Sequence, residues 1–167
     1  MKKWNLKVLC SMGVLLAAQI VLSRFCSFSV WNMKIGVAFI PVVLCALLFG
    51  PLASAAVSAL GDFLGAILFP IGAYFPGFTL TAFFSGLLWG IVAKNQSVPR
   101  ILLAVALNQL LCSLLLNSLW VSVLYHSPFL PVLATRVVQC AIVGPVQFIV
   151  VFLLRKPMVQ LRKQVEL

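Results

Sequence analysis

The apolar runs in this sequence are too long and too free of charge for the interior of a small soluble domain. Of the 167 residues, 63% are hydrophobic and 8% are charged, whereas about a quarter of the residues in a soluble domain are charged. About 20 apolar helical residues cross the hydrocarbon core of a bilayer, so six crossings use about 120 residues and leave only short loops. The sequence therefore predicts an all-α integral membrane protein, a six-transmembrane-helix bundle that forms a single domain over residues 1–167.

Proline and glycine mark the ends of the predicted helices. Gly50-Pro51 separates the second from the third, the segment from Pro70 to Gly77 separates the third from the fourth, and Pro99 and Pro128 precede the fifth and the sixth. The predicted helices cover residues 6–25, 35–49, 52–69, 77–94, 100–124 and 131–154. The second of these is short for a full crossing.

Lysine and arginine are distributed unevenly between the two sides of this topology. The side with both termini carries Lys2, Lys3, Lys7, Lys94, Arg100, Arg155, Lys156, Arg162 and Lys163. The other side carries Arg24 and Lys34, with Arg136 just inside a helix. Positive residues favour the cytoplasm, so both termini are predicted to be cytoplasmic in a multi-pass protein of the cell membrane. The net charge of +10 is therefore explained by basic residues that orient the protein in the lipid bilayer. We predict no nucleic acid as a partner.

Apart from the cytoplasmic clusters and Glu166, four charged residues remain: Arg24, Lys34, Asp62 and Arg136. An ionisable residue within a membrane is costly and by default marks a functional site. The predicted topology places all four in the outer half of the bundle. An ion pair between Asp62 and an arginine could simply hold helices together, but three cations and one anion leave positive charge unbalanced. We therefore favour a ligand site.

Polar and aromatic side chains extend this cluster. One stripe on the sixth helix consists of Arg136, Gln139, Cys140 and Gln147. Another on the fifth helix consists of Gln109, Ser113, Asn117 and Trp120, with Asn108 to one side. The turn before the fourth helix supplies Tyr74, Phe75 and Gly77. Each amide could make an ordinary interhelical hydrogen bond, but two such stripes beside a charge cluster predict a lined cavity.

Catalytic and metal-binding motifs are not found. The sequence has no Gly-x-x-x-x-Gly-Lys-Ser/Thr loop for ATP, and its five cysteines lack the spacing of a zinc site. The one histidine, His126, has no acid or nucleophile near it in the sequence, and Asp62 lacks the second acid of a membrane hydrolase. We predict no enzyme, no catalytic residue, no metal and no cofactor in this chain. The chain also shows no inverted repeat of broken helices, so a binding protein is favoured over a secondary transporter.

Several short runs have a recognisable pattern: Leu22-Ser23-Arg24-Phe25, Lys34-Ile35-Gly36, Asp62-Phe63-Leu64-Gly65 and, as the most specific, Tyr74-Phe75-Pro76-Gly77-Phe78-Thr79. These runs resemble the folate-specific substrate-binding (S) components of energy-coupling-factor (ECF) vitamin transporters. The resemblance extends from about residue 8 to 155. It implies a six-helix bundle that binds folate or a reduced folate outside the cell and releases it inside.

The chemistry of folate suits these residues. Asp62 and Asn108 could accept hydrogen bonds from the pterin ring, and an arginine could stack on it. Lys34 and Arg136 suit the two carboxylates of the glutamate tail. The predicted ligand-binding residues are Arg24, Lys34, Asp62, Tyr74, Phe75, Gly77, Asn108, Trp120, Arg136 and Gln139.

The resemblance also implies partners: an ECF transmembrane scaffold subunit and two cytoplasmic ATPases, which use the ATP. The first helix would dock on the scaffold through a small-residue motif, for which Gly13, Ala17 and Val21 are the candidates. Three alternatives remain: an S component for another vitamin, a non-transporting membrane scaffold of similar shape, and a small membrane enzyme.

Overall fold

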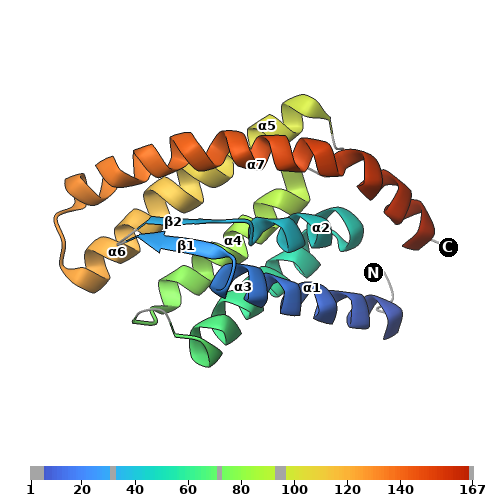
Figure 1. The fold of residues 1–167 in the computed structure, drawn as a ribbon, viewed down its shortest axis with the longest axis horizontal. Helices are drawn as coiled ribbons and strands as arrows, with labels where there is room; N and C mark the ends of the chain where they lie inside the picture. The colour runs from blue at the N-terminus through green and yellow to red at the C-terminus, as the bar shows by residue number, and fades with distance from the viewer. Residues whose placement is uncertain (1–5, 31–32, 71–72, 93–96, 166–167) are drawn as a thin grey trace.

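The computed structural model describes residues 6–30, 33–70, 73–92 and 97–165, with side chains described in these ranges except at 28–30, 33–35 and 155–165. The elements in chain order are α1 Leu6–Arg24, β1 Ser27–Val30, β2 Met33–Gly36, α2 Phe39–Phe49, α3 Pro51–Leu68, α4 Pro76–Val92, α5 Val98–Leu107, the π-helical segment η2 Asn108–Leu116, α6 Asn117–Tyr125 and α7 Phe129–Val165. Because α5, η2 and α6 are continuous, the chain forms a bundle of six helical rods (Figure 1).

The six rods correspond to the six predicted helices, with differences at their ends. The fifth contains a π-helical segment that periodicity did not predict. The sixth continues as α7 to Val165, eleven residues beyond the predicted end. The rod α1 begins and α7 ends at the same end of the molecule, which we call the terminal end (Figure 1).

A β-hairpin between α1 and α2 corrects the purely helical prediction. Strands β1 and β2 pair antiparallel, with Ser27 opposite Gly36 and Val30 opposite Met33. Residues 35 and 36, which we assigned to the second helix, therefore belong to a strand, and α2 begins at Phe39. Both strand sequences, Ser-Phe-Ser-Val and Met-Lys-Ile-Gly, are too short and too mixed for a helical stripe. We call the opposite end of the bundle the hairpin end.

Helices α3 and α4 pack at very close range because small residues lie between them. A Cβ atom built on Gly86 would lie 2.6 Å from the backbone oxygen of Ser54, and one on Gly90 would clash with Pro51. The Ser54 hydroxyl also donates to the carbonyl of Val42 on α2, at 3.0 Å. Small residues spaced by four let helices approach closely in lipid, and these positions pack within the chain.

The terminal end holds the apolar core. Its largest fully buried side chains include Val43 of α2, Trp89 of α4, Ile101 of α5 and Val151 of α7. These residues belong to one cluster, which also contains Leu47 and Val105. Four helices therefore meet there, and every member of the cluster is a hydrophobic residue.

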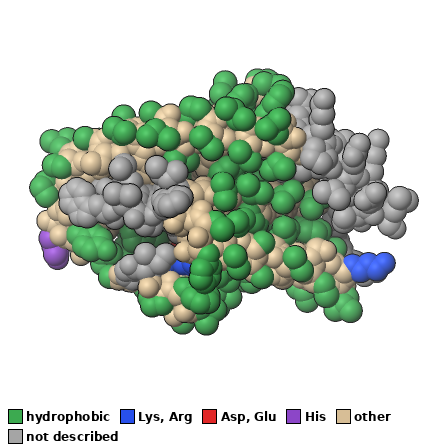
Figure 2. Space-filling model, viewed as in Figure 1, with side chains coloured by type: hydrophobic (Ala, Val, Ile, Leu, Met, Phe, Trp, Pro, Cys, Tyr) green, Lys and Arg blue, Asp and Glu red, His purple; other side chains and the backbone are tan. Residues whose placement is uncertain are grey.

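Hydrophobic side chains are spread over most of the described part of the face that Figure 2 shows. Among the residues that the structure describes, four helical stretches are long and apolar enough to cross a membrane: Leu6–Arg24, Pro51–Leu68, Val98–Tyr125 and Phe129–Leu154. The shorter apolar helices are Phe39–Phe49 and Pro76–Val92. Exposed leucines such as Leu130 and Leu153 cover this surface, which suits lipid better than water.

Candidate ligand-binding cavity

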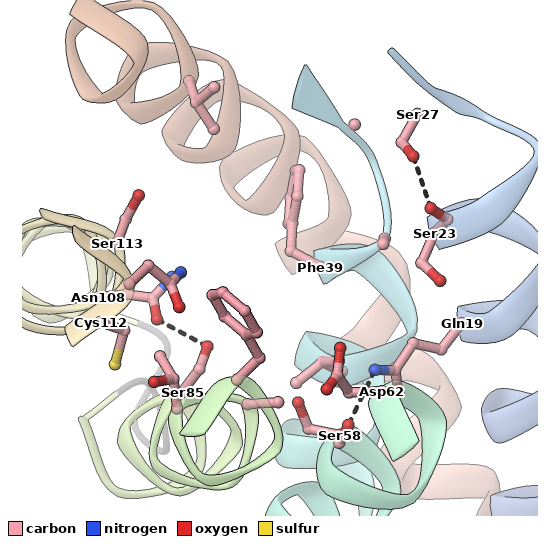
Figure 3. Close-up of a pocket in the computed structure, with 18 of the residues that line it drawn as sticks. Gln19, Ser23, Ser27, Phe39, Ser58, Asp62, Ser85, Asn108, Cys112 and Ser113 are labelled. Carbon is pink, nitrogen blue, oxygen red and sulfur yellow. Dashed lines mark hydrogen bonds between the residues drawn. The ribbon is translucent and has the colours of Figure 1, made fainter. Parts of the chain in front are cut away.

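A cavity of about 420 Å³ occupies the hairpin half of the bundle. Its walls come from all six rods, the hairpin and the turn before α4, and Figure 3 shows polar side chains from several of these elements turned toward one space. The polar residues that line it are Gln19, Ser23, Arg24, Ser27, Ser58, Asp62, Tyr74, Thr81, Ser85, Asn108, Gln109, Ser113, Asn117, Arg136 and Gln147. This volume is within the usual range for small-molecule sites, about 300–1,000 Å³.

Two glycines of α3 make room for the polar side chains of α1. A Cβ on Gly61 would lie 2.7 Å from the amide of Gln19, and one on Gly65 would lie 3.0 Å from Nε of Arg24. Gln19 is 7% exposed, and its Nε2 donates to the backbone oxygen of Ser58 at 3.2 Å. Its Oε1 and the Nε of Arg24 are buried without a hydrogen-bond partner among the described residues. The α1–α3 contact therefore offers one acceptor and one donor to a ligand.

Asp62 lies at the end of a short chain of hydroxyl groups from α4 and the turn before it. Thr79 donates to its Oδ2 at 3.0 Å, and the Thr79 hydroxyl lies 3.2 Å from the hydroxyl of Tyr74. The carboxylate is partly exposed to the cavity. Among the side chains that the structure describes, its partner is this hydroxyl and not an arginine. The second carboxylate oxygen is thus available to accept from a ligand.

An aromatic wall follows the turn before α4. The rings of Phe75 and Trp120 are 5.5 Å apart between centroids and tilted by 44°, and Phe78 meets Phe75 edge-on. Gly77 allows this packing, because a Cβ there would lie 2.5 Å from the Trp120 ring. Trp120 also donates from Nε1 to the Thr81 hydroxyl at 3.0 Å. Such a wall offers flat apolar surface to a ring-shaped ligand.

Amide side chains line the η2 and α7 side. Ser85 donates to Oδ1 of Asn108 at 2.7 Å, and Gln109 donates from Nε2 to Oε1 of Gln147 at 3.0 Å. Arg136 is 7% exposed, and its buried Nε has no hydrogen-bond partner among the described residues. This side therefore presents both amide groups and a cation.

Comparison with known proteins identifies the family of this chain. The family described as "ECF transporter, substrate-specific component" matches residues 7–155. The chain belongs to this family.

This substrate-specific component is similar to two folate transporters. It is 40% identical over 154 residues to folate transporter FolT of Clostridium novyi (strain NT), a match that covers 91% of this chain and 88% of the relative. It is 32% identical over 144 residues to FolT of Leuconostoc mesenteroides subsp. mesenteroides, covering 81% and 77%.

Two solved structures have the same fold as this substrate-specific component. A crystal structure of FolT bound with folic acid aligns with a TM-score of 0.86 and 34% identity, covering 92% of this chain and 95% of that one. An S component for biotin from an ECF-type ABC transporter aligns with a TM-score of 0.68 and 16% identity, covering 93% and 94%. The second likeness concerns the fold alone.

The structure brings most of the predicted site residues of this substrate-specific component together. Six line the cavity: Arg24, Asp62, Tyr74, Phe75, Asn108 and Arg136. Gly77 and Trp120 lie behind Phe75 and Thr81 without lining it, and Gln139 is buried on α7 outside the lining. Lys34 pairs with Ser29 through the hairpin backbone, and its side chain lies outside the described part of the structure.

Sequence reasoning missed Gln19 and the hydroxyls of Thr79 and Ser85. A glutamine within an otherwise apolar first helix was a usable signal, because burying an amide is costly without a partner. The predicted docking residues Gly13, Ala17 and Val21 are all exposed on α1, and a Cβ on Gly13 would meet nothing within 4 Å.

Proposed function

We propose that this protein is the high-affinity folate-binding subunit of an ECF-type, ATP-driven vitamin importer, and that it captures folate at the hairpin end for release inside the cell. The observation that carries this function is the lined cavity in a chain so similar to FolT bound with folic acid. Subunits of this kind bind and deliver a ligand without transforming it, so this protein is not an enzyme.

The proposed contacts follow the chemistry of folate. The pterin ring carries N–H donors, which Asp62 and Asn108 accept, and its flat face stacks on the Arg24 guanidinium and the Phe75 ring. The carboxylates of the glutamate tail pair with Arg136 and with Lys34. The acceptors Asp62 on α3 and Asn108 on η2, together with the buried cation Arg136 on α7, support this orientation of the ligand.

The proposed topology has six crossings and both termini in the cytoplasm, within a single domain. Helix α2 spans only 11 residues, which is about 16 Å of helix and half of the hydrocarbon core. Strand β2 runs into α2 and packs beside α7, so strand and helix together supply the second crossing. Backbone that is not helical is tolerated at membrane depth where protein covers it.

The proposed partners are an ECF transmembrane scaffold and two cytoplasmic ATPases. The exposed face of α1 with Gly13, Ala17 and Val21 is the proposed docking surface, because its small residues leave room for a close helix. ATP is then used by the partner subunits and not by this chain.

Calorimetry in detergent tests the ligand. The purified chain should bind folic acid tightly without ATP, and should bind biotin, riboflavin or thiamine at least about a thousandfold more weakly, a difference of about 4 kcal/mol. Tight binding of one of the other vitamins in place of folic acid would contradict the proposed ligand while keeping the family.

A liposome assay tests the division of labour. The lone chain, reconstituted with ATP inside, should not accumulate folate against a gradient, because it has no nucleotide-binding motif. Robust accumulation by the chain alone would disprove the requirement for partner ATPases.

A further inference from the structure

The fifth rod carries a stripe of residues spaced at every fourth position. Val105, Gln109 and Val121 are buried, and Ser113 and Asn117 line the cavity between them. These five residues come from α5, η2 and α6 in turn. All five therefore lie on the inward side of one continuous rod.

An α-helix cannot keep such a stripe on one side. It turns about 100° per residue, so a spacing of four advances the stripe by about 40° per step. Four steps, from Val105 to Val121, would rotate the stripe by about 160° and bring its end to the lipid side. Some element of the rod must cancel this rotation.

The π-helical segment η2 cancels it. Its bonds join residues five apart, so a turn holds roughly 4.4 residues and each step of four falls short of a full turn by about 30°. The steps from Gln109 to Ser113 and on to Asn117 lie within or at the end of η2. They rotate the stripe backwards and offset the two forward steps in α5 and α6.

Exposure on the opposite side agrees with this register. Leu110, Leu111 and Leu115 are 54%, 42% and 49% exposed on the outer surface. In an α-helix that faces the cavity at Asn108, Leu111 and Leu115 would turn inward with Cys112, and Ser113 and Asn117 would turn outward. The π register thus places Ser113 and Asn117 in the cavity wall, where an α register would place Leu111 and Leu115.

Contacts from two neighbouring helices hold η2 at its first turn. Asn108 accepts from Ser85 of α4, and Gln109 donates to Gln147 of α7. The thiol of Cys140 lies 3.6 Å from both the backbone oxygen of Gln109 and the hydroxyl of Ser113. Side chains of α4 and α7 therefore fix the position at which the α register changes.

We propose that the π-helical register of η2 turns Ser113 and Asn117 into the cavity, where both contact the ligand. They are then specificity residues in addition to the charged residues Arg24, Asp62 and Arg136. Their hydroxyl and amide contact the ligand beside Asn108 and Gln109 and reject ligands that cannot hydrogen-bond there. The inference rests on the proposed folate site for the identity of the ligand, but the register itself is independent of it.

Single-cysteine labelling tests the register in the full chain. The native cysteines are each replaced by serine, so that Cys140→Ser keeps a donor beside Gln109, and Ser113→Cys, Asn117→Cys, Leu111→Cys and Leu115→Cys are added singly to this background. Each variant is reconstituted in nanodiscs and treated with a membrane-impermeant maleimide. Thiols that face an aqueous cavity form the reactive thiolate, so the first two should react at least about tenfold faster than the leucine positions. Folic acid should slow the first two by about tenfold or more and biotin should not.

The outcomes separate the two proposals. Faster labelling at the leucine positions would show an α register and overturn the inference. Fast labelling of Ser113→Cys and Asn117→Cys without protection by bound folic acid would overturn their assignment to the ligand. Calorimetry on the cysteine-free background measures folic acid binding separately. Absence of binding there would contradict the proposed function, whichever positions are labelled.

Discussion

The terminal half and the hairpin half of the bundle are built from the same rods but have opposite interiors. Ile101 of α5 is 2% exposed in an apolar cluster, and Trp89 of α4, which is 1% exposed, belongs to the same cluster and borders the cavity. Further along the same two rods, Ser85 and Asn108 face a cavity of about 420 Å³. Each rod therefore contributes apolar residues to stability at one end and polar residues to a ligand at the other. The position of a substitution along a rod should decide which property it changes.

The largest expected effect is a loss of stability in the terminal half. Ile101→Ala removes a fully buried side chain that packs with Val43 and Trp89, and should lower the free energy of unfolding by about 2–5 kcal/mol. Unfolding in detergent measures this change. The matched control, Leu102→Ala on the 56% exposed neighbour, should change it by less than about 1 kcal/mol. If Ile101→Ala lowered the free energy of folate binding as much as the free energy of unfolding, the two halves would not have separate roles.

The next effect is a loss of affinity in the hairpin half. Asp62→Asn keeps the shape of the side chain but turns one acceptor into a donor, so folate binding should weaken by about 1.5–3 kcal/mol, the value of a hydrogen bond to a charged group. Arg24→Lys keeps the charge but loses the planar guanidinium, and should also weaken binding. Calorimetry measures both. If Asp62→Asn unfolds the protein while the folded remainder binds folate normally, Asp62 has a structural role only.

A smaller effect is expected at the turn before α4. Replacing Tyr74 and Phe75 together with alanine removes the ring beside Trp120 and the hydroxyl partner of Thr79. Folate should dissociate about tenfold faster, because most affinity differences at one site arise in the dissociation rate. Stopped-flow fluorescence measures the rate. Phe84→Ala, on a 41% exposed ring of α4, is the matched control and should leave dissociation unchanged.

The smallest effect concerns the glycine that accommodates Gln19. Gly61→Ala places a methyl group 2.7 Å from the Gln19 amide, so the side chain must turn away and lose its bond to Ser58. Folate affinity should fall by about 1 kcal/mol, the net value of one hydrogen bond. Gly13→Ala meets open space and should bind folate like the parent. Equal affinities for the two variants would remove Gln19 from the site.

The sequence predicts the rods and the charge cluster because both depend on local patterns. Runs of apolar residues and isolated charges are visible in one dimension, and the structure places Arg24, Asp62 and Arg136 in the lining of one cavity. The hairpin is less visible, since each strand has four residues and no strong turn signal joins them. We assigned its second strand in part to a helix for this reason.

Other features depend on contacts between distant residues. The π register of η2 is held by Ser85, Cys140 and Gln147, which lie between 23 and 38 residues away from their partners. Thr79 becomes part of the site only because α3 and α4 bring it to Asp62. A helical wheel assumes 3.6 residues per turn throughout, so it placed Trp120 in the stripe, whereas its indole packs behind Phe75.

The length of α7 has a mechanical consequence. The helix runs from Phe129 to Val165, of which the apolar part ends at Leu154. About 16 Å of helix thus extends past the apolar part. Between Arg136 and Val165 the helix contains Pro145 and Pro157, and a proline inside a helix removes a backbone hydrogen bond and favours a bend. A force applied at the projecting end therefore reaches the cavity wall at Arg136 through two positions where the helix bends easily.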